Sequence, residues 1–179
     1  MDLLLSDWVF GYGSLIWNPE IDFDRSEIAR AHGYHRAFCI SSTRYRGTRA
    51  APGVVLGLDR GGSCVGVAMH LHHPRRRDSI ARLYEREMLN RVYTPTLVAL
   101  TLRSGAQIRA LSFVANRASP DYQQLTEAQI LERLRRCSGE RGANRDYALN
   151  TLRALEERGV HDARLARLVH RLLSGQLGH

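Results

Sequence analysis

The chain has 179 residues, enough for one hydrophobic core and too few for two well-buried ones, so a single domain over residues 1–179 is predicted. Hydrophobic residues make up 44% of the chain, a typical globular share that excludes extensive disorder. The formal net charge of +8 rests on 26 arginines without any lysine, which excludes a Walker-type phosphate loop and a lysine Schiff base.

The positive charge by itself does not indicate a nucleic-acid partner. The arginines are spread along the chain and often stand beside acidic residues, as in Glu132–Arg133 and Arg145–Asp146. The one dense cluster, Arg75–Arg77, follows Pro74 at a predicted loop-to-helix junction, where a solvated turn is expected. We therefore expect no nucleic acid among the partners.

The sequence also lacks membrane and secretion signals. No stretch approaches the roughly 20 apolar residues that span a bilayer, and the start of the chain lacks the basic region and long apolar run of a signal peptide. The three cysteines are far apart and lack metal-site spacing, so each is expected to be a small buried apolar residue. These features predict a cytoplasmic protein without a membrane partner.

In the first half of the chain, the pattern predicts strands followed by one helix. Trp8–Phe10 is a short β-prone run that ends at glycines, as a strand entering a loop does. Three further segments are strand-like: residues 34–42, 53–58 and 64–71. A predicted turn at Asp59–Gly62 separates the second segment from the third. Residues 78–89 then change to a helical period.

In the second half, a hairpin precedes three helices. Strands over 96–102 and 107–114 are joined by Ser104–Gly105. A capping box formed by Thr126 and Gln129 begins a helix that reaches about Cys137. The other two helices are expected over 144–158, ending at Gly159, and from Asp162 to about Leu173. Strands first and helices last predict an α+β domain, with a mixed sheet or partial β-barrel, flanking helices and a helical C-terminal part.

The loop after the first predicted strand is a candidate binding loop. Gly11 and Gly13 enclose Tyr12, and closely spaced glycines let the main chain turn sharply or approach a ligand. Such turns expose amide N–H groups that can bind a carboxylate or an oxyanion, and Ser14 adds a hydroxyl. The pattern is neither a serine-hydrolase elbow nor a dinucleotide-binding motif. The residues alone leave a merely structural turn equally open.

The helix predicted over residues 78–89 carries an acidic residue on its apolar face. Its apolar positions, spaced i, i+3, i+4 and i+8, are Ile80, Leu83, Tyr84 and Met88. Glu87 takes the i+7 position, whereas Glu85 and Arg86 are expected to point elsewhere. A buried carboxylate without a partner suits general acid/base chemistry. Periodicity leaves open that Glu87 instead pairs with a buried arginine or lies at the exposed margin.

Other polar residues are weaker candidates. His70, His72 and His73 lie close together, and the first and second are expected to share a strand face. They lack further ligands at suitable spacing, so a metal site is not expected. Tyr147 stands at a core position of its helix and could present its hydroxyl to a site.

Several segments together resemble the ChaC-like family of gamma-glutamylcyclotransferases. They occur in the family's order and cover nearly the whole chain, which makes the resemblance more specific than any single motif. The segments are residues 8–19 (WVFGYGSLIWNP), 33–38 (GYHRAF), 46–48 (RGT), 52–53 (PG), 57–64 (GLDRGGSC), 66–68 (GVA), 84–88 (YEREM) and 144–151 (NRDYALNT).

The resemblance implies a lyase that acts on a small molecule, typically glutathione, and releases 5-oxoproline and Cys-Gly. The substrate's own α-amine attacks its γ-carbonyl, so the family needs no metal or cofactor. Glu87 would be the catalytic acid/base, with Glu85 as the fallback. The implied substrate-binding residues are Tyr12, Gly13, Ser14 and Leu15, with Arg46 and Tyr147 as lesser candidates. The alternatives are a relative acting on other gamma-glutamyl amines or peptides, and a basic binding or regulatory module with a degenerate site.

Overall fold

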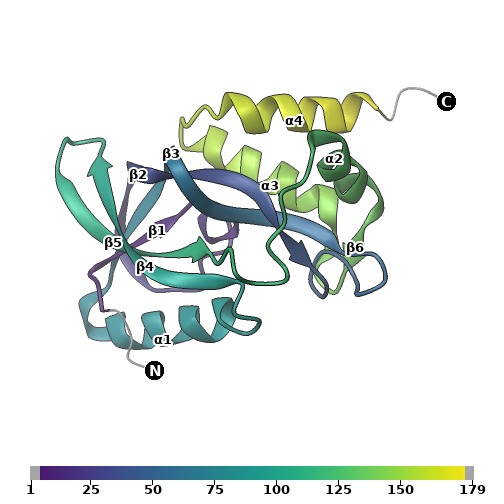
Figure 1. Cartoon of the computed structure of the whole chain (residues 1–179). Helices are drawn as coiled ribbons and strands as arrows, with labels where there is room; N and C mark the ends of the chain where they lie inside the picture. The colour runs from purple at the N-terminus through teal and green to yellow at the C-terminus, as the bar shows by residue number, and fades with distance from the viewer. Residues whose placement is uncertain (1–4, 176–179) are drawn as a thin grey trace. The chain divides into compact units, whose positions relative to one another are not determined.

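The computed structural model describes residues 5–175, which divide into two compact units. Unit 1 comprises the described residues up to Ala37 together with Gly57–Ser119, and unit 2 comprises Phe38–Leu56 together with the described chain from Pro120 onward. The single domain over residues 1–179 stays a prediction. The elements of Figure 1 are β1 (Trp8–Gly11), η1 (Ser14–Ile16), β2 (Phe23–Ser42), β3 (Gly53–Leu71), η2 (His73–Arg75), α1 (Arg76–Glu87), β4 (Tyr93–Leu102), β5 (Gln107–Ala115), α2 (Glu127–Arg136), β6 (Ser138–Gly139), β7 (Gly142–Ala143), α3 (Asn144–Glu157) and α4 (Ala163–Ser174).

The main sheet is a closed barrel with the strand order β1-β3-β2-β4-β5. Strand β1 runs antiparallel to β3, with Val9 opposite Met69, and parallel to β5, with Val9 opposite Leu111. Strands β4 and β5 form the predicted hairpin, where Gly105 adopts the left-handed φ of +92° that the tight turn requires. The predicted α+β class with a mixed, barrel-like sheet is therefore confirmed.

Two strand predictions were wrong in extent. The predicted turn at Asp59–Gly62 is absent, because β3 continues through it as one strand. Gly61 and Gly62 have φ values of +98° and +72°, which bend the strand without reversing it. Strand β2 begins at Phe23 rather than at residue 34. Its early part alternates small buried residues with exposed polar ones, and Ala29 pairs with Leu102 of β4.

Helix α1 belongs to unit 1 and buries the predicted stripe. Ile80, Leu83 and Tyr84 are buried, and the Tyr84 ring meets Phe113 of β5 edge to face, with 5.7 Å between ring centroids. The helix ends at Glu87, two residues earlier than predicted, because Met88 caps it through a 2.9 Å hydrogen bond from its N–H to Tyr84 O. The apolar stripe therefore does not continue as a helical face beyond Glu87.

In unit 2, helices α2, α3 and α4 pack on one another. Thr126 and Gln129 form the predicted capping box at the start of α2, and the Asp162 side chain accepts the Leu165 N–H at the start of α4. Gly159, with a φ of +71°, follows the end of α3. All three helical predictions are confirmed to within two residues.

The cysteines match the expectation that each is a small buried residue. Cys39, Cys64 and Cys137 are buried, and burial raises the pKa of the Cys137 thiol. Within residues 5–175, no helix is both long enough and apolar enough to cross a membrane.

Candidate active site

The loop after β1 is a tight main-chain turn that runs into η1. The Ile16 N–H donates to Gly13 O over 2.9 Å, and the Asn18 N–H donates to Ser14 O over 2.7 Å. The first amides of such a turn, those of Ser14 and Leu15, have no acceptor within the helix they begin. Main-chain donors therefore gather where the sequence predicted a binding loop.

Close packing fixes the point where β1 enters this loop. A Cβ atom on Gly66 of β3 would lie 2.4 Å from Gly11 O and 2.8 Å from the Phe10 ring, so only glycine fits there. The Tyr12 side chain is buried, and its hydroxyl donates to Phe113 O over 2.7 Å. The Tyr12 ring thus anchors the loop to β5, and the main chain is what this residue offers to a ligand.

Arg36 holds the same loop from β2. Its Nε donates to Tyr12 O over 2.6 Å, and its Nη2 donates to Val65 O over 2.8 Å. The guanidinium thereby joins the start of the loop to β3. Arg36 lies within one of the segments that resemble the family, but no role was predicted for it.

Glu87, the last residue of α1, turns its carboxylate inward, with 15% of the side chain exposed. Its Oε1 lies 3.1 Å from Arg86 Nε, so the carboxylate has an ion-pair partner. The expectation of a buried carboxylate without a partner was therefore wrong, and arginine pairing, one alternative that periodicity left open, is what the structure has. Glu85 is exposed and lies on another face of the helix.

Arg86 is the residue whose direction was wrongly predicted from the sequence. It was expected to point away from the apolar face, yet its side chain is only 13% exposed. Its Nη2 donates to Ser14 Oγ over 2.9 Å and its Nη1 to Asn18 O over 2.7 Å. The signal lies in a second stripe, because Ser79 and Leu83 are buried and Arg86 follows them at i+7 and i+3.

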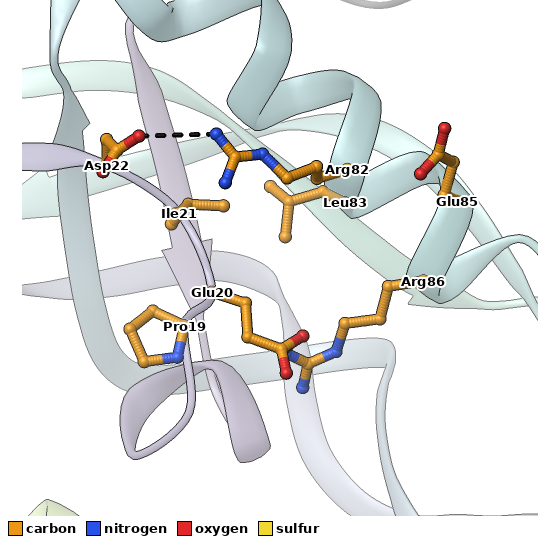
Figure 2. A pocket seen from close by; sticks show the side chains of 8 residues that line it. All are labelled: Pro19, Glu20, Ile21, Asp22, Arg82, Leu83, Glu85 and Arg86. Atoms are coloured by element: carbon orange, nitrogen blue, oxygen red, sulfur yellow. Dashed lines mark hydrogen bonds and ion pairs between the residues drawn. The ribbon is translucent and has the colours of Figure 1, made fainter.

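A groove of about 670 Å³ borders this cluster (Figure 2). Arg86 pairs with Glu20 across it at 3.1 Å, and Arg82 pairs with Asp22 at 3.4 Å. The groove combines acidic and basic side chains with a few apolar ones. Its lining residues are Pro19, Glu20, Ile21, Asp22, Arg82, Leu83, Glu85 and Arg86.

The two remaining predicted site residues, Arg46 and Tyr147, contact each other within unit 2. The Tyr147 hydroxyl accepts the Leu56 N–H over 3.2 Å, and the Arg46 guanidinium carbon lies 5.8 Å from the Tyr147 ring centroid. Arg46 is buried, donates to Ala143 O over 3.1 Å, and has its pKa lowered by that burial. The structure thus joins the loop and Glu87 through Arg86 in unit 1, and pairs Arg46 with Tyr147 in unit 2.

The histidines take separate positions. His70 lies on β3 and its Nδ1 is 2.8 Å from Asp24 Oδ1, while His72 follows the end of that strand. His72 thus lies one residue beyond β3, and both His70 and His72 interact with the Asp24 carboxylate. In the part of the chain that the structure describes, no three His, Cys, Asp or Glu residues cluster as metal ligands would.

The sequence of the chain matches a known protein family. The model of the ChaC-like protein family matches residues 7–174, and this chain belongs to that family. Over 87% of its length it is 37% identical to the glutathione-specific gamma-glutamylcyclotransferase of Escherichia coli (strain K12), and the match covers 68% of that relative.

A plant relative and a solved yeast structure are also similar to this chain. The chain is 30% identical to gamma-glutamylcyclotransferase 2-3 of Arabidopsis thaliana, over 92% of this chain and 87% of that relative. It also superposes on the crystal structure of a yeast gamma-glutamyl cyclotransferase specific to glutathione, with a TM-score of 0.86 over 96% of this chain and 97% of that one. At 20% sequence identity, that likeness establishes the fold.

Proposed function

We propose that the protein is a gamma-glutamylcyclotransferase that converts glutathione to 5-oxoproline and Cys-Gly. Family membership and the 37% identity to the glutathione-specific Escherichia coli enzyme support this activity. The observation that carries it is the link from the Ser14 hydroxyl of the loop through Arg86 to the inward carboxylate of Glu87. Such a site can bind an anionic or polar group and move a proton beside it.

In the proposed reaction, the substrate supplies its own nucleophile. The α-amino nitrogen attacks the γ-carbonyl carbon, which forms the C–N bond of the five-membered ring. The C–N bond to the cysteine residue then breaks. The attacking nitrogen enters as an ammonium and ends as the ring amide N–H, so it loses two protons. Glu87 passes them one after the other to the departing nitrogen, which leaves as the ammonium of Cys-Gly, so protons and charge balance without added water.

The loop contributes binding and orientation in this scheme. We assign the γ-glutamyl group to the main-chain donors of Tyr12–Leu15 because the Tyr12 side chain is committed to Phe113 O. Ser14 already binds Arg86 through its hydroxyl, which favours its amide as the substrate contact. Holding the amine next to its own carbonyl removes much of the orientational entropy of ring closure.

Arg46 and Tyr147 remain candidates for a second binding role. A buried guanidinium is suited to a substrate carboxylate, and Tyr147 would form the wall beside it. Their proposed role rests on the family resemblance and on the contact between them.

The proposal is tested by incubating the protein with glutathione and with gamma-glutamyl-alanine and assaying 5-oxoproline. We expect release from glutathione, and a fall in turnover of about 10²–10⁴-fold in Glu87→Gln, because the amide cannot shuttle the proton. The matched control is Glu85→Gln, which changes an exposed carboxylate of the same helix and should keep native turnover.

Each contrary outcome points to a different alternative. Release from gamma-glutamyl-alanine alone would favour a relative with another gamma-glutamyl substrate. Native turnover in a folded Glu87→Gln variant would remove Glu87 from the mechanism. No release from either substrate, together with salt-sensitive retention on an anionic polymer, would favour a binding module.

A further inference from the structure

Arg86 contacts the loop, the groove and Glu87 with one guanidinium group. Its Nε meets Glu87 Oε1 at 3.1 Å and its Nη2 meets Ser14 Oγ at 2.9 Å. Its Nη1 meets both Asn18 O at 2.7 Å and Glu20 Oε2 at 3.1 Å. All three nitrogens of the side chain therefore have acceptors, and these acceptors come from four different residues.

We propose, on the basis of the cyclotransferase function above, that Arg86 is a positioning residue that fixes the Glu87 carboxylate relative to the substrate loop. The guanidinium plane is rigid, so contacts on all of its nitrogens set both distance and direction between the groups it joins. Ser14 and Asn18 are the two ends of the turn closed by the hydrogen bond from Asn18 N–H to Ser14 O. Arg86 therefore binds both ends of the turn through its two Nη atoms and binds the Glu87 carboxylate through its Nε.

The end of α1 makes this arrangement possible. Adjacent residues within a helix project about 100° apart, which would ordinarily separate the Arg86 and Glu87 side chains. Met88 caps the helix directly after them, and both side chains lie inward, at 13% and 15% exposed. A guanidinium in the last helical turn is also favoured by the helix dipole. The end of α1 at Glu87 thus allows the Arg86 and Glu87 side chains to meet.

Arg82 provides the comparison on the same helix and in the same groove (Figure 2). Its side chain is 53% exposed, and its ion pair is with Asp22, at 3.4 Å. Exposed pairs of this kind contribute little to stability. Arg82 shares the helix, the charge and the groove with Arg86, while Asp22 lies outside the turn that Arg86 holds.

The experiment measures kcat and KM for 5-oxoproline release, with melting temperatures, in Arg86→Met, Arg86→Lys and the control Arg82→Met. We expect Arg86→Met to lower kcat by about 10²-fold through misplacement of the base, with a smaller change in KM. Arg86→Lys keeps the charge but has one nitrogen, so we expect an intermediate loss of about tenfold. Arg82→Met, which removes a charge from the groove without touching the Ser14–Asn18 turn or Glu87, should lower kcat less than either Arg86 variant does.

Chemical rescue separates positioning from a purely structural role. In Arg86→Ala, added methylguanidinium should raise kcat by at least about tenfold, because the site accepts a free guanidinium in the same place. The same addition should leave Glu87→Gln inactive. A structural side chain would not give a rescue that depends on Glu87.

The outcomes distinguish a failure of the positioning role of Arg86 from a failure of the proposed cyclotransferase function. If the wild-type protein releases no 5-oxoproline from either substrate, the proposed function fails and the role of Arg86 falls with it. If the wild type is active while Arg86→Lys and Arg86→Met retain native kcat, only the role of Arg86 is overturned. If Arg86→Met does not fold, the other two variants still test the role of Arg86. Native kcat in Arg86→Lys would overturn that role, and so would the absence of rescue in a folded Arg86→Ala variant.

Discussion

The loop after β1 and the start of β3 are both main-chain segments held by side chains from distant parts of the sequence. At the loop, two arginines bind the chain, Arg36 at Tyr12 O and Arg86 at Asn18 O. Arg86 is partly exposed through the groove and also binds carboxylates. The loop is therefore held by charged contacts at the edge of the groove.

The start of β3, in unit 2, is held by neutral groups that are fully enclosed. Asn144 has no exposed surface, and its amide accepts the Val54 N–H over 2.7 Å and donates to Val54 O over 2.8 Å. Two residues along β3, Leu56 N–H donates to the Tyr147 hydroxyl. Side chains from the first turn of α3 thus bind main-chain groups of this stretch.

The two regions differ in what they leave for a ligand. Enclosed neutral hydrogen bonds satisfy the protein's own groups and mainly stabilise the fold. Charged contacts beside a groove keep polar groups near solvent, where a substrate can reach them. We therefore expect substitutions at Arg86 to change turnover and substitutions at Asn144 to change stability.

The largest expected effect on stability is that of Asn144→Ala. The substitution leaves a buried N–H and a buried C=O of Val54 without partners, at about 1–3 kcal/mol each. We expect the free energy of unfolding to fall by about 2–4 kcal/mol, measured by urea denaturation. The control is Asn150→Ala, a partly exposed asparagine of the same helix, for which we expect a change within about 0.5 kcal/mol. An equal loss in both variants would contradict the anchoring role of Asn144.

The second prediction, Tyr147→Phe, tests whether this hydroxyl belongs to the fold or to the site. The ring stays in the core and the hydrogen bond from Leu56 N–H is lost, so we expect a stability loss of about 1 kcal/mol. If the hydroxyl also contacts substrate, KM for glutathione should rise in the same variant. A stability loss with native KM would make Tyr147 an anchor and remove it from the substrate-binding residues.

Local signals in the sequence predicted the helices and the hairpin well. The capping box of Thr126 and Gln129, the glycine after α3 and the turn at Gly105 all depend on residues that are close in sequence. The start of β2 was missed because Ala29 and Ala31 give a weak apolar signal, and their pairing with β4 joins residues far apart in the chain. The continuity of β3 was missed because its two glycines look like a reversing turn.

In the candidate site too, features that depend on residues close in sequence were predicted, and contacts between distant residues were missed. Periodicity placed Glu87 on the inward face of α1, and the structure agrees. The contacts of Arg86 were missed because a serine and a charged residue were not counted toward a buried stripe, although Ser79 is fully buried. Arg36 binds a carbonyl on a different strand, a contact between distant residues that the sequence pattern does not reveal.

The smallest effect on stability is expected at the pair of Asp24 and His70. This pair is more exposed than the pair of Arg86 and Glu87, so it should contribute little to the free energy of unfolding. The hydrogen bond from His70 lowers the pKa of the Asp24 carboxyl below its ordinary value of 3.8. A lowered carboxyl pKa stabilises the folded protein above the ordinary pKa, and this contribution is lost as the pH falls through the lowered value. Asp24→Asn should therefore melt slightly below the wild type near neutrality, and the gap should close in acid.

The matched control is the same substitution in a His70→Gln background. If His70 is the cause, the fall in melting temperature that Asp24→Asn produces should shrink in that background at every pH above the ordinary pKa. Salt should also shrink it, because both side chains are partly exposed and the interaction is screened. A difference that persists in acid, or that is as large as the loss in Asn144→Ala, would show that surface charge contributes more to this fold than the enclosed neutral contacts do.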